Sequence, residues 1–319
     1  MSRRERAEAG FTIVELMVAM LLFAMLSIGM LTTVSMFART QRSTAAIDVA
    51  QAGVRASLEL ISRDVEMAAA GARGGTVFFA NGAQPQLLAV RVTDSSTGPD
   101  TLNLILVNPN AQGTLMAGYS TGQTNLSLSS TAGFGVGDLI QVSDLVNAVV
   151  LQVTAVGGST LTVVANANPL PRSFAAGAWV FGSRQVTYYV DSAAFGAQDP
   201  LLMFDPDGPG ALPGQPLAEG VEDMQVALGF DTNANGILTN VGAAAGDDEW
   251  VHNVAGEVAP ATLVALRAVR VTLVARTVQM GQGTRGTRPA LEDRPGAGAP
   301  DAFARRVLKS EISVRNFNL

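Results

Sequence analysis

Residues 1–38 read MSRRERAEAG FTIVELMVAM LLFAMLSIGM LTTVSMFA, a short basic leader followed by a long apolar run. The run carries one charged residue, Glu15, and exceeds the roughly 20 residues that a helix needs to cross a bilayer. The arginines ahead of the run predict that the leader stays on the cytoplasmic side. A secretory signal has its small residues after the apolar stretch, whereas here they precede it and end at Gly10. Cleavage after Gly10 would therefore remove the leader and keep a membrane anchor.

Glu15 is the anomaly in this anchor. A carboxylate costs roughly 2.5–3.5 kcal/mol at the centre of a membrane helix and less near its ends. Cleavage after Gly10 would give Phe11 a free α-amino group one helical turn before Glu15. That amine, in the same chain or in a neighbouring subunit, is a natural counter-charge for the carboxylate. The alternative is a single-pass anchor with an interfacial glutamate.

The string GFTIVELMVA at 10–19 closely resembles the class III signal of type IV pilins and of type II secretion pseudopilins. The resemblance implies that a membrane prepilin peptidase cuts after Gly10 and methylates Phe11. It also implies that Glu15 helps to dock the subunit into a growing fibre. Many major pilins have a helix-bending proline or glycine in the second half of this segment, where this chain has Gly29 and Thr32 but no proline. That departure slightly weakens assignment as a major subunit.

The composition describes a folded, acidic chain without cysteine. Hydrophobic residues make up 48% and charged residues 15% of the sequence, a balance typical of structured proteins. The 33 glycines, with many threonines, valines and asparagines in the same chain, favour β-structure with many turns. A general nucleic-acid binder presents a basic face, so a net charge of −6 predicts no nucleic-acid partner.

An amphipathic stretch continues the helical pattern beyond residue 38. Its apolar residues recur at spacings of three and four and form one stripe: Ile47, Ala50, Val54, Leu58, Ile61, Val65 and Ala68. Arg55, Glu59 and Arg63 follow at i, i+4 on another face, where they can pair in water. Gly71 predicts that the helix ends near Ala70.

Short strands separated by turns fill the rest of the chain. Strand patterns occur at 87–92, 102–107, 126–128, 139–142, 149–156, 161–164, 185–190, 201–204, 221–230, 266–277 and 306–316. Those between 115 and 182, joined by glycine-rich turns, predict a small barrel or sandwich inserted in the main fold. We therefore expect a leader at 1–10, a transmembrane or fibre-core helix at 11–38, an amphipathic helix at 39–75, a pilin-like β head at 76–114 and 183–319, and an inserted β module at 115–182.

The second half of the chain carries a further resemblance. LAEGVEDMQV at 217–226, GFD at 229–231, Trp250, LRAVRVTL at 266–273 and VRN at 314–316 resemble the PilW group of type IV minor pilins, as does GDLIQVSD at 137–144. This group is similar to the J-type pseudopilins of type II secretion. The resemblance implies a place near the pilus tip, with other minor pilins, as a primer for assembly and a mount for a PilY-type adhesin.

The turn after residue 230 is a candidate calcium site. Asp231, Asn233 and Asn235 supply oxygens at alternate positions, and the following glycine resembles the first half of an EF-hand loop. The twelfth position of that pattern is a glycine rather than the required glutamate, but Asp247, Asp248 and Glu249 follow and could fold back. The alternative is an Asx-rich hairpin turn without a metal.

Other features argue against an enzyme. A single histidine, His252, and no cysteine exclude the usual zinc sets and most histidine-based triads. The carboxylate pair Glu222/Asp223 lies on a predicted strand, where neighbours point to opposite faces. The Gly/Pro/Arg-rich segment 281–302 is expected to be a mobile loop, and the arginines there and nearby to be solvated: Arg285, Arg288, Arg294, Arg305 and Arg306.

The sequence thus predicts an α+β fold, a pilin-like lollipop with a long N-terminal helix packed on a β-rich head. The predicted function is a minor pilin of a priming or tip complex, in contact with other minor pilins, the major pilin, prepilin peptidase and a PilY-type adhesin. Its expected location is the bacterial inner membrane, with the head outside the cytoplasm, and then the pilus base or tip. A J-type pseudopilin and a membrane-tethered envelope binding protein or enzyme remain alternatives.

Overall fold

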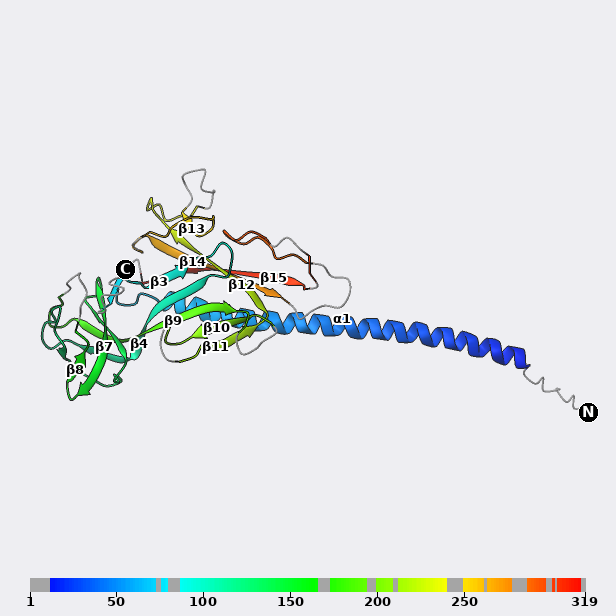
Figure 1. The fold of residues 1–319 in the computed structure, drawn as a ribbon, viewed down its shortest axis with the longest axis horizontal. Helices are drawn as coiled ribbons and strands as arrows, with labels where there is room; N and C mark the ends of the chain where they lie inside the picture. The colour runs from blue at the N-terminus through cyan, green and yellow to red at the C-terminus, as the bar shows by residue number, and fades with distance from the viewer. Residues whose placement is uncertain are drawn as a thin grey trace, which may run out of the picture. The chain divides into compact units, whose positions relative to one another are not determined.

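The structure is a computed structural model that describes residues 12–72, 76–79, 87–165, 173–193, 199–208, 212–239, 249–260, 263–276, 286–296, 300–301 and 303–316. The chain divides into two compact units, residues 1–49 and residues 50–319. A helix followed by a β-rich head confirms the predicted α+β class (Figure 1).

Helix α1 (Ile13–Met67) is continuous across the unit boundary. The predicted helix is confirmed, although it ends a few residues before Ala70. Ala69 and Gly71 have φ angles of 60° and 77°, and this left-handed backbone cannot continue a right-handed helix. The last helical turns belong to the second unit, and their apolar stripe of Val54, Leu58, Ile61 and Val65 is buried there as the spacing predicts.

Most strands of the second unit form one eleven-stranded sheet. Its members are β1 (Thr76–Phe79), β2 (Leu87–Leu88), β3 (Val90–Thr93), β4 (Thr101–Thr114), β5 (Asn125–Ser127), β6 (Leu139–Ser143), β7 (Ala148–Gly157), β8 (Thr160–Val163), β9 (Trp179–Asp191), β10 (Leu201–Asp205) and β11 (Gln215–Glu219). The path runs β11-β10-β9-β6-β7-β1-β2, with β4 pairing β3 and β9, and β8 pairing β5 and β7. Pairing is antiparallel except between β1 and β7.

Strands β4 and β9 are longer than the sequence predicted. The expected strands covered 102–107 and 185–190, whereas the two observed strands pair from Leu102 opposite Tyr188 to Thr114 opposite Trp179. The register shifts between Asn108 and Gln112. Pro109 lies in that shift, and a proline inside a strand pattern argues against a strand unless a bulge accommodates it.

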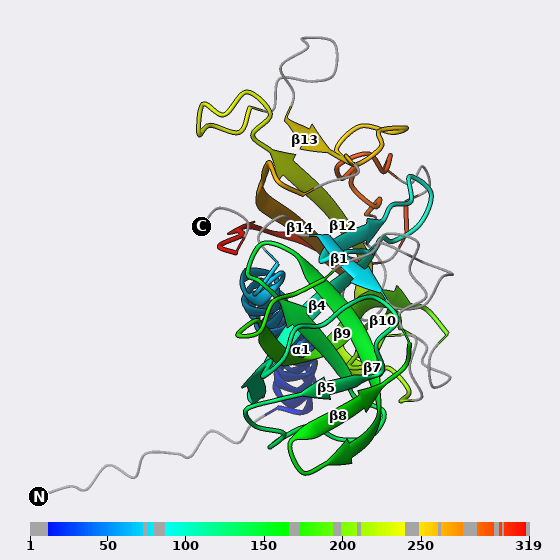
Figure 2. The ribbon, with the colours of Figure 1, turned by 90° about the vertical axis from the view of Figure 1, so that its left-hand side faces the viewer.

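The strands between 115 and 182 enclose a core of their own. Figure 2 shows β5, β7 and β8 grouped together in this part of the second unit. The buried residues of this smaller core include Tyr119, Leu126, Leu128, Ile140, Leu151, Leu161 and Phe174. Strand β7 alternates, so that Ala148 and Val150 face the main core while Val149 and Leu151 face this smaller one.

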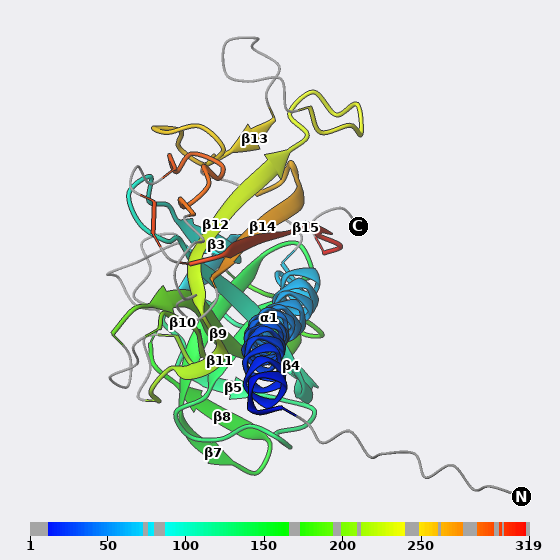
Figure 3. The same cartoon turned by 90° about the vertical axis from the view of Figure 1, so that its right-hand side faces the viewer.

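The remaining strands form a four-stranded antiparallel sheet in the order β13-β12-β14-β15 (Figure 3). These are β12 (Val221–Phe230), β13 (Trp250–Val251), β14 (Leu266–Arg276) and β15 (Arg305–Ser313). One face carries Met224, Val226, Val271 and Leu273 into the main core, which the helical stripe and the larger sheet share. The predicted alternation of 266–277 is confirmed.

The opposite face of this sheet is polar and covered by residues 286–296, which we call the strap. Asp223 on β12 is fully buried and pairs with Arg288 at 3.0 Å and with Arg294 at 2.5 Å. On β14, Arg270 pairs with Glu292 of the strap. The expectation of a solvated loop is therefore wrong for the strap, because buried carboxylates on the sheet take its arginines as counter-charges.

Two other arginines of the predicted cluster behave differently from each other. Arg305 pairs with Glu222 and Asp301, and the hydrogen bond from Arg305 lowers the pKa of Asp301 to about 2. Arg306 is exposed. Arg285 lies outside the described residues. Glu222 and Asp223 contact different partners, since Glu222 pairs with Arg305 and Asp223 pairs with Arg288 and Arg294.

Candidate functional site

Glu15 and Thr12 form a reciprocal cap at the start of α1. The Glu15 N–H donates to Thr12 Oγ1 at 3.2 Å, and the Thr12 N–H donates to Glu15 Oε2 at 3.2 Å. The Thr12 hydroxyl also donates to Glu15 Oε2. The pattern supplies acceptors for N–H groups that a first helical turn leaves without intrahelical partners, and it places an acid at the positive end of the helix dipole. The capping role of Thr12 was not predicted from the sequence, although a threonine three residues before a glutamate is a known capping signature.

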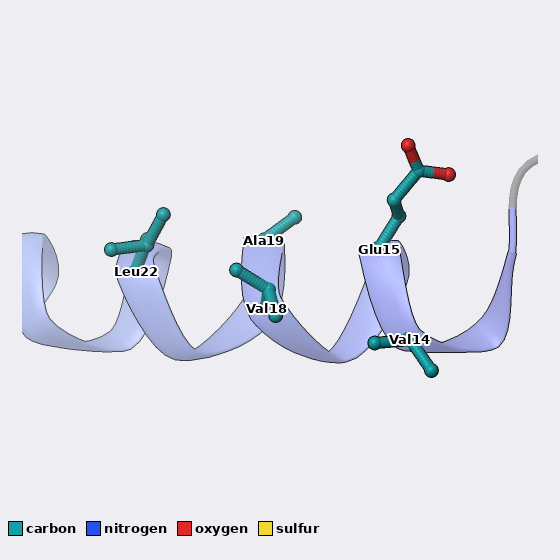
Figure 4. Close-up of a pocket in the computed structure, with 5 residues that line it drawn as sticks. All are labelled: Val14, Glu15, Val18, Ala19 and Leu22. Carbon is teal, nitrogen blue, oxygen red and sulfur yellow. The ribbon is translucent and has the colours of Figure 1, made fainter.

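Apolar side chains continue from this cap along the helix. Val14, Glu15, Val18, Ala19 and Leu22 line an open hollow on the helix surface (Figure 4). Glu15, Ala19 and Leu22 point to the same side, as spacings of four and three on a helix require. A single acid thus heads an apolar strip that has room for another apolar helix to pack against it.

Within the described residues, Ile13–Ala38 is the helix that length and composition suit to a bilayer. Its large apolar side chains are exposed, including those of Met20, Phe23 and Phe37. Such a surface is unfavourable in water and favourable in lipid or against other apolar helices. Gly10 and Phe11, the predicted cleavage and methylation positions, lie outside the described residues, so both remain predictions.

The candidate calcium turn is held by its own side chains. Asn233 Oδ1 accepts the N–H of Asn235 at 2.9 Å, and Asn235 Oδ1 accepts the N–H of Ile237 at 2.7 Å. Asp231 is buried, and its Oδ2 accepts the Gly236 N–H at 3.1 Å and the Arg267 Nε–H at 3.3 Å. These are the contacts of an Asx-rich turn.

Glu249 folds back on this turn, as the sequence suggested, but it binds backbone groups. Its Oε1 accepts the N–H of Thr232 at 3.0 Å, and its Oε2 accepts the N–H of Thr239 at 3.3 Å. Asp247 and Asp248 lie outside the described residues. Asp231 Oδ1 is buried without a hydrogen-bond partner among the described residues, which leaves one oxygen for a cation or water. The calcium site remains a prediction.

The end of α1 is fastened to the head by contacts that sequence reasoning missed. Tyr188 on β9 donates its hydroxyl to Asp64 Oδ2 at 2.6 Å. The Asn316 amide donates to the carbonyls of Glu66 and Ala68 at 3.1 and 2.9 Å. Gln141 Nε2 donates to the carbonyl of Ala70 at 2.9 Å. The partners are far apart in sequence, so no local pattern announces them.

The described residues contain no group of three His, Cys, Asp or Glu side chains arranged to hold a metal ion. His252 is buried after β13 with its Nδ1 3.4 Å from Asp94 Oδ2. Asp94 was not singled out from the sequence.

Two family models match the chain. Type IV pilus-assembly protein W matches residues 187–316, and the prokaryotic N-terminal methylation motif matches residues 6–31. The first match spans β10 to β15 with the end of β9, and the second includes the cap at Glu15. The motif and the apolar helix together indicate membrane anchoring.

Among solved structures, a type IV-like pilin from Thermus thermophilus is similar at 13% sequence identity and a TM-score of 0.41, covering 84% of this chain and 97% of that chain. No curated protein sequence matches the chain significantly. The two family matches, one over the processing motif and one over the β-rich head, support the assignment of this chain as a type IV minor pilin with a PilW-like head.

Proposed function

We propose that this minor pilin joins a priming or tip complex for type IV pilus assembly, and that its role is structural rather than catalytic. The observation that carries the proposal is the capped acid, Glu15, at the head of an exposed apolar helix of membrane length. Glu15 and most of this helix segment lie within the residues that the methylation motif matches. An acid in this setting needs a cation, and a pilus offers one in each processed subunit.

The proposed mechanism begins with removal of residues 1–10 by prepilin peptidase and methylation of the new N-terminus at Phe11. The bonds to Thr12 engage one carboxylate oxygen, Oε2, of Glu15. The terminal amine of a neighbouring subunit then neutralises the carboxylate, because an unpaired charge in hydrocarbon is costly. Packing of the apolar strip against neighbouring helices completes the docking.

The proposed partners are other minor pilins, the major pilin, prepilin peptidase and a PilY-type tip adhesin. The proposed location is the bacterial inner membrane as a single-pass protein, with the N-terminus cytoplasmic before processing and the head outside. From there the subunit would enter the pilus base or tip. The three arginines of the leader support this orientation.

Mass spectrometry of the protein recovered from its native membrane tests the processing step. We expect the chain to begin at Phe11 and to carry one added methyl group on its α-amine. A native chain that still begins at Met1 would overturn the proposed mechanism, since the amine that pairs with Glu15 would not exist.

Two substitutions at one position separate the charge of Glu15 from its capping role. Glu15→Ala removes both, whereas Glu15→Gln keeps a side chain that can cap the first turn and removes the charge. We expect both variants to insert in the membrane and both to lose most of their recruitment into complexes with other pilins. Glu59→Gln, a matched change on the exposed face of α1, is the control and should behave as wild type.

The same recovery experiment distinguishes the rival assignment. Wild-type complexes that contain pilus components support the proposal, while complexes that contain type II secretion components instead would make the chain a pseudopilin. Full recruitment of Glu15→Gln would show that the charge has no part in docking.

A further inference from the structure

A buried corner of the head gathers the chain's single histidine and several carboxylates. His252 follows β13, and its Nδ1 lies 3.4 Å from Asp94 Oδ2. Asp94 and Asp100 flank the turn between β3 and β4. Asp293 of the strap interacts electrostatically with Asp94, His252 and Glu257, and Asp100 interacts with Asp94 and Asp293. Three separate segments therefore bring titratable groups to one place.

Asp293 is a buried carboxylate that has no ion pair among the described residues. It is 7% exposed, and neither of its carboxylate oxygens accepts a hydrogen bond from another described residue. The adjacent Arg294 is directed to Asp223, 2.5 Å away. Burying an ionised carboxylate without a donor is costly, and such a group reduces the cost by taking up a proton.

His252 is placed by the fold with little freedom. It is 5% exposed and has a φ of 68°, a conformation that is uncommon for residues other than glycine. Its distance from Asp94 is longer than a hydrogen bond, and both ring nitrogens are buried without a hydrogen-bond partner among the described residues.

Among the described residues, the neighbouring elements do not supply a positive charge to Asp293. On β12, Asp223 takes both Arg288 and Arg294 of the strap. On β14, Arg270 pairs with Glu292 and lies 4.0 Å from the ring centroid of Trp250. Glu257 accepts the N–H groups of Asn253 and Val254 at 3.3 and 3.2 Å. The described arginines on these elements are thus paired with other carboxylates, and Glu257 is bonded to backbone groups. The described residues of the corner therefore include more carboxylates than cations.

We propose that this corner is a proton-binding site that fastens the strap to the head, with Asp293 as the proton acceptor. A proton on Asp293 removes its repulsion with Asp94 and Asp100. The strap is then held on the head by its arginine pairs without that opposing repulsion.

The expected pH dependence has a definite sign. Burial raises the pKa of Asp100 to about 7, against the opposing hydrogen bonds from the N–H groups of Val226 and Ser95. Burial, then the charge of Asp94, raises the pKa of Asp293. A carboxyl with a raised pKa binds its proton more tightly in the folded protein. Its stabilising effect is complete below the ordinary value of 3.8 and is lost as the pH rises through about 7.

Thermal unfolding of the full chain in detergent micelles, measured between pH 5 and pH 8, tests the proposal. We expect the wild-type Tm to be higher at pH 5 than at pH 8 by roughly 3 °C or more, as each pKa shift is a stability difference. Asp293→Asn, which resembles the protonated form, should raise the Tm at pH 8 and flatten the dependence. Glu59→Gln removes an exposed carboxylate and should keep the wild-type dependence.

The change of Tm with pH in the Asp293→Asn variant is the critical measurement for the proposal. A slope equal to that of wild type would overturn the proposal, and so would a wild-type Tm that falls from pH 8 to pH 5. Calcium that raises the wild-type Tm at pH 8 without affecting Asp293→Asn would also overturn it, by identifying a metal in place of the proton. Hydrogen exchange of the strap amides, corrected for intrinsic rates, gives a second measure and should show greater protection at pH 5. None of these outcomes depends on pilus assembly.

Discussion

At the scale of single residues, Asp64 shows how a buried charge is tolerated where α1 meets the head. Asp64 is 3% exposed, and Tyr188, whose hydroxyl it accepts at 2.6 Å, is fully buried. Burial and the contact with Asp64 raise the pKa of Tyr188, so its hydroxyl keeps its proton and remains a donor. The pair makes the polar side chain of the helix compatible with the surrounding apolar core.

We expect Tyr188→Phe to lower the free energy of unfolding by about 1–3 kcal/mol, because the Asp64 carboxylate would be left buried without this donor. Denaturant unfolding of the full chain in detergent measures the loss. Tyr189→Phe is the matched control, since Tyr189 lies next on the same strand and is only half-buried. Equal losses in the two variants would show that the Tyr188 hydroxyl has no special role.

The calcium hypothesis at Asp231 is also a question of single atoms. Asp231 Oδ1 is the buried acceptor that lacks a partner among the described residues, whereas Oδ2 is shared by Gly236 and Arg267. A bound calcium ion should raise stability by about 1.4 kcal/mol at ten times its Kd. We expect calcium to raise the Tm of wild type and to have no such effect on Asp231→Asn. Identical melting with calcium and with chelator would remove the hypothesis.

At the scale of elements, the end of α1 is completed by distant residues. The last carbonyls of a helix have no intrahelical donors, and here Asn316 donates to one of them, that of Glu66. Just beyond the helix, Asn316 also donates to the carbonyl of Ala68, and Gln141 donates to that of Ala70. Ser143 of β6 donates to the carbonyl of Gly71. The helix thus ends in a cap built from the C-terminal segment and from strand β6.

We expect Asn316→Asp to cost about 1–3 kcal/mol of unfolding free energy, since it keeps the shape of the side chain and removes its two donated hydrogen bonds. Hydrogen exchange of the amides in residues 61–67 should accelerate with it. Arg315→Gln is the control: Arg315 is largely exposed and pairs with Glu66 at the surface, where ion pairs contribute little. If Asn316→Asp proves no more damaging than Arg315→Gln, the cap is not a stabilising element.

The elements with regular local patterns were predictable from the sequence. The spacing of Val54, Leu58 and Ile61 identifies the buried helical face, and the alternation in 266–277 identifies β14 with both of its faces. Glu15 stood out because it interrupts an apolar run. Each of these signals lies within one or two turns of helix or one strand.

Features set by distant pairing were not predictable in the same way. The parallel pairing of β1 with β7 joins Val77 to Ala148, and no local pattern specifies that register. The full length of β4 was not predicted, because Pro109 argues against a continuous strand. The arginines of the strap looked solvated because their partner, Asp223, lies on a strand more than sixty residues earlier. The corner at His252 is formed by residues 94–100, residues 252–257 and the strap. The sequence of each segment alone predicts only a turn or a loop.

At the scale of the second unit, two cores share their strands. Apart from Ala111, the buried residues of the smaller core lie within the predicted module at 115–182, and we propose this range as a unit that unfolds locally. Strand β8 contributes Leu161 and Val163 to the smaller core alone, whereas β7 supplies side chains to both cores. Local opening of the module is therefore expected to begin at β5 and β8, because β5 pairs with β8 and β8 joins the rest of the eleven-stranded sheet through β7.

The substitution Leu161→Ala tests this division. Leu161 is fully buried in the smaller core, and truncation of such a leucine costs about 2–5 kcal/mol. We expect faster hydrogen exchange in β5, β7 and β8 and unchanged protection in β12 and β14. Leu273→Ala, an equally buried leucine of the main core, is the matched control and should accelerate exchange in the four-stranded sheet first. If Leu161→Ala instead accelerates exchange equally in β8 and β14, the shared strands couple the two cores into one cooperative unit, and the module is a feature of topology without a stability of its own.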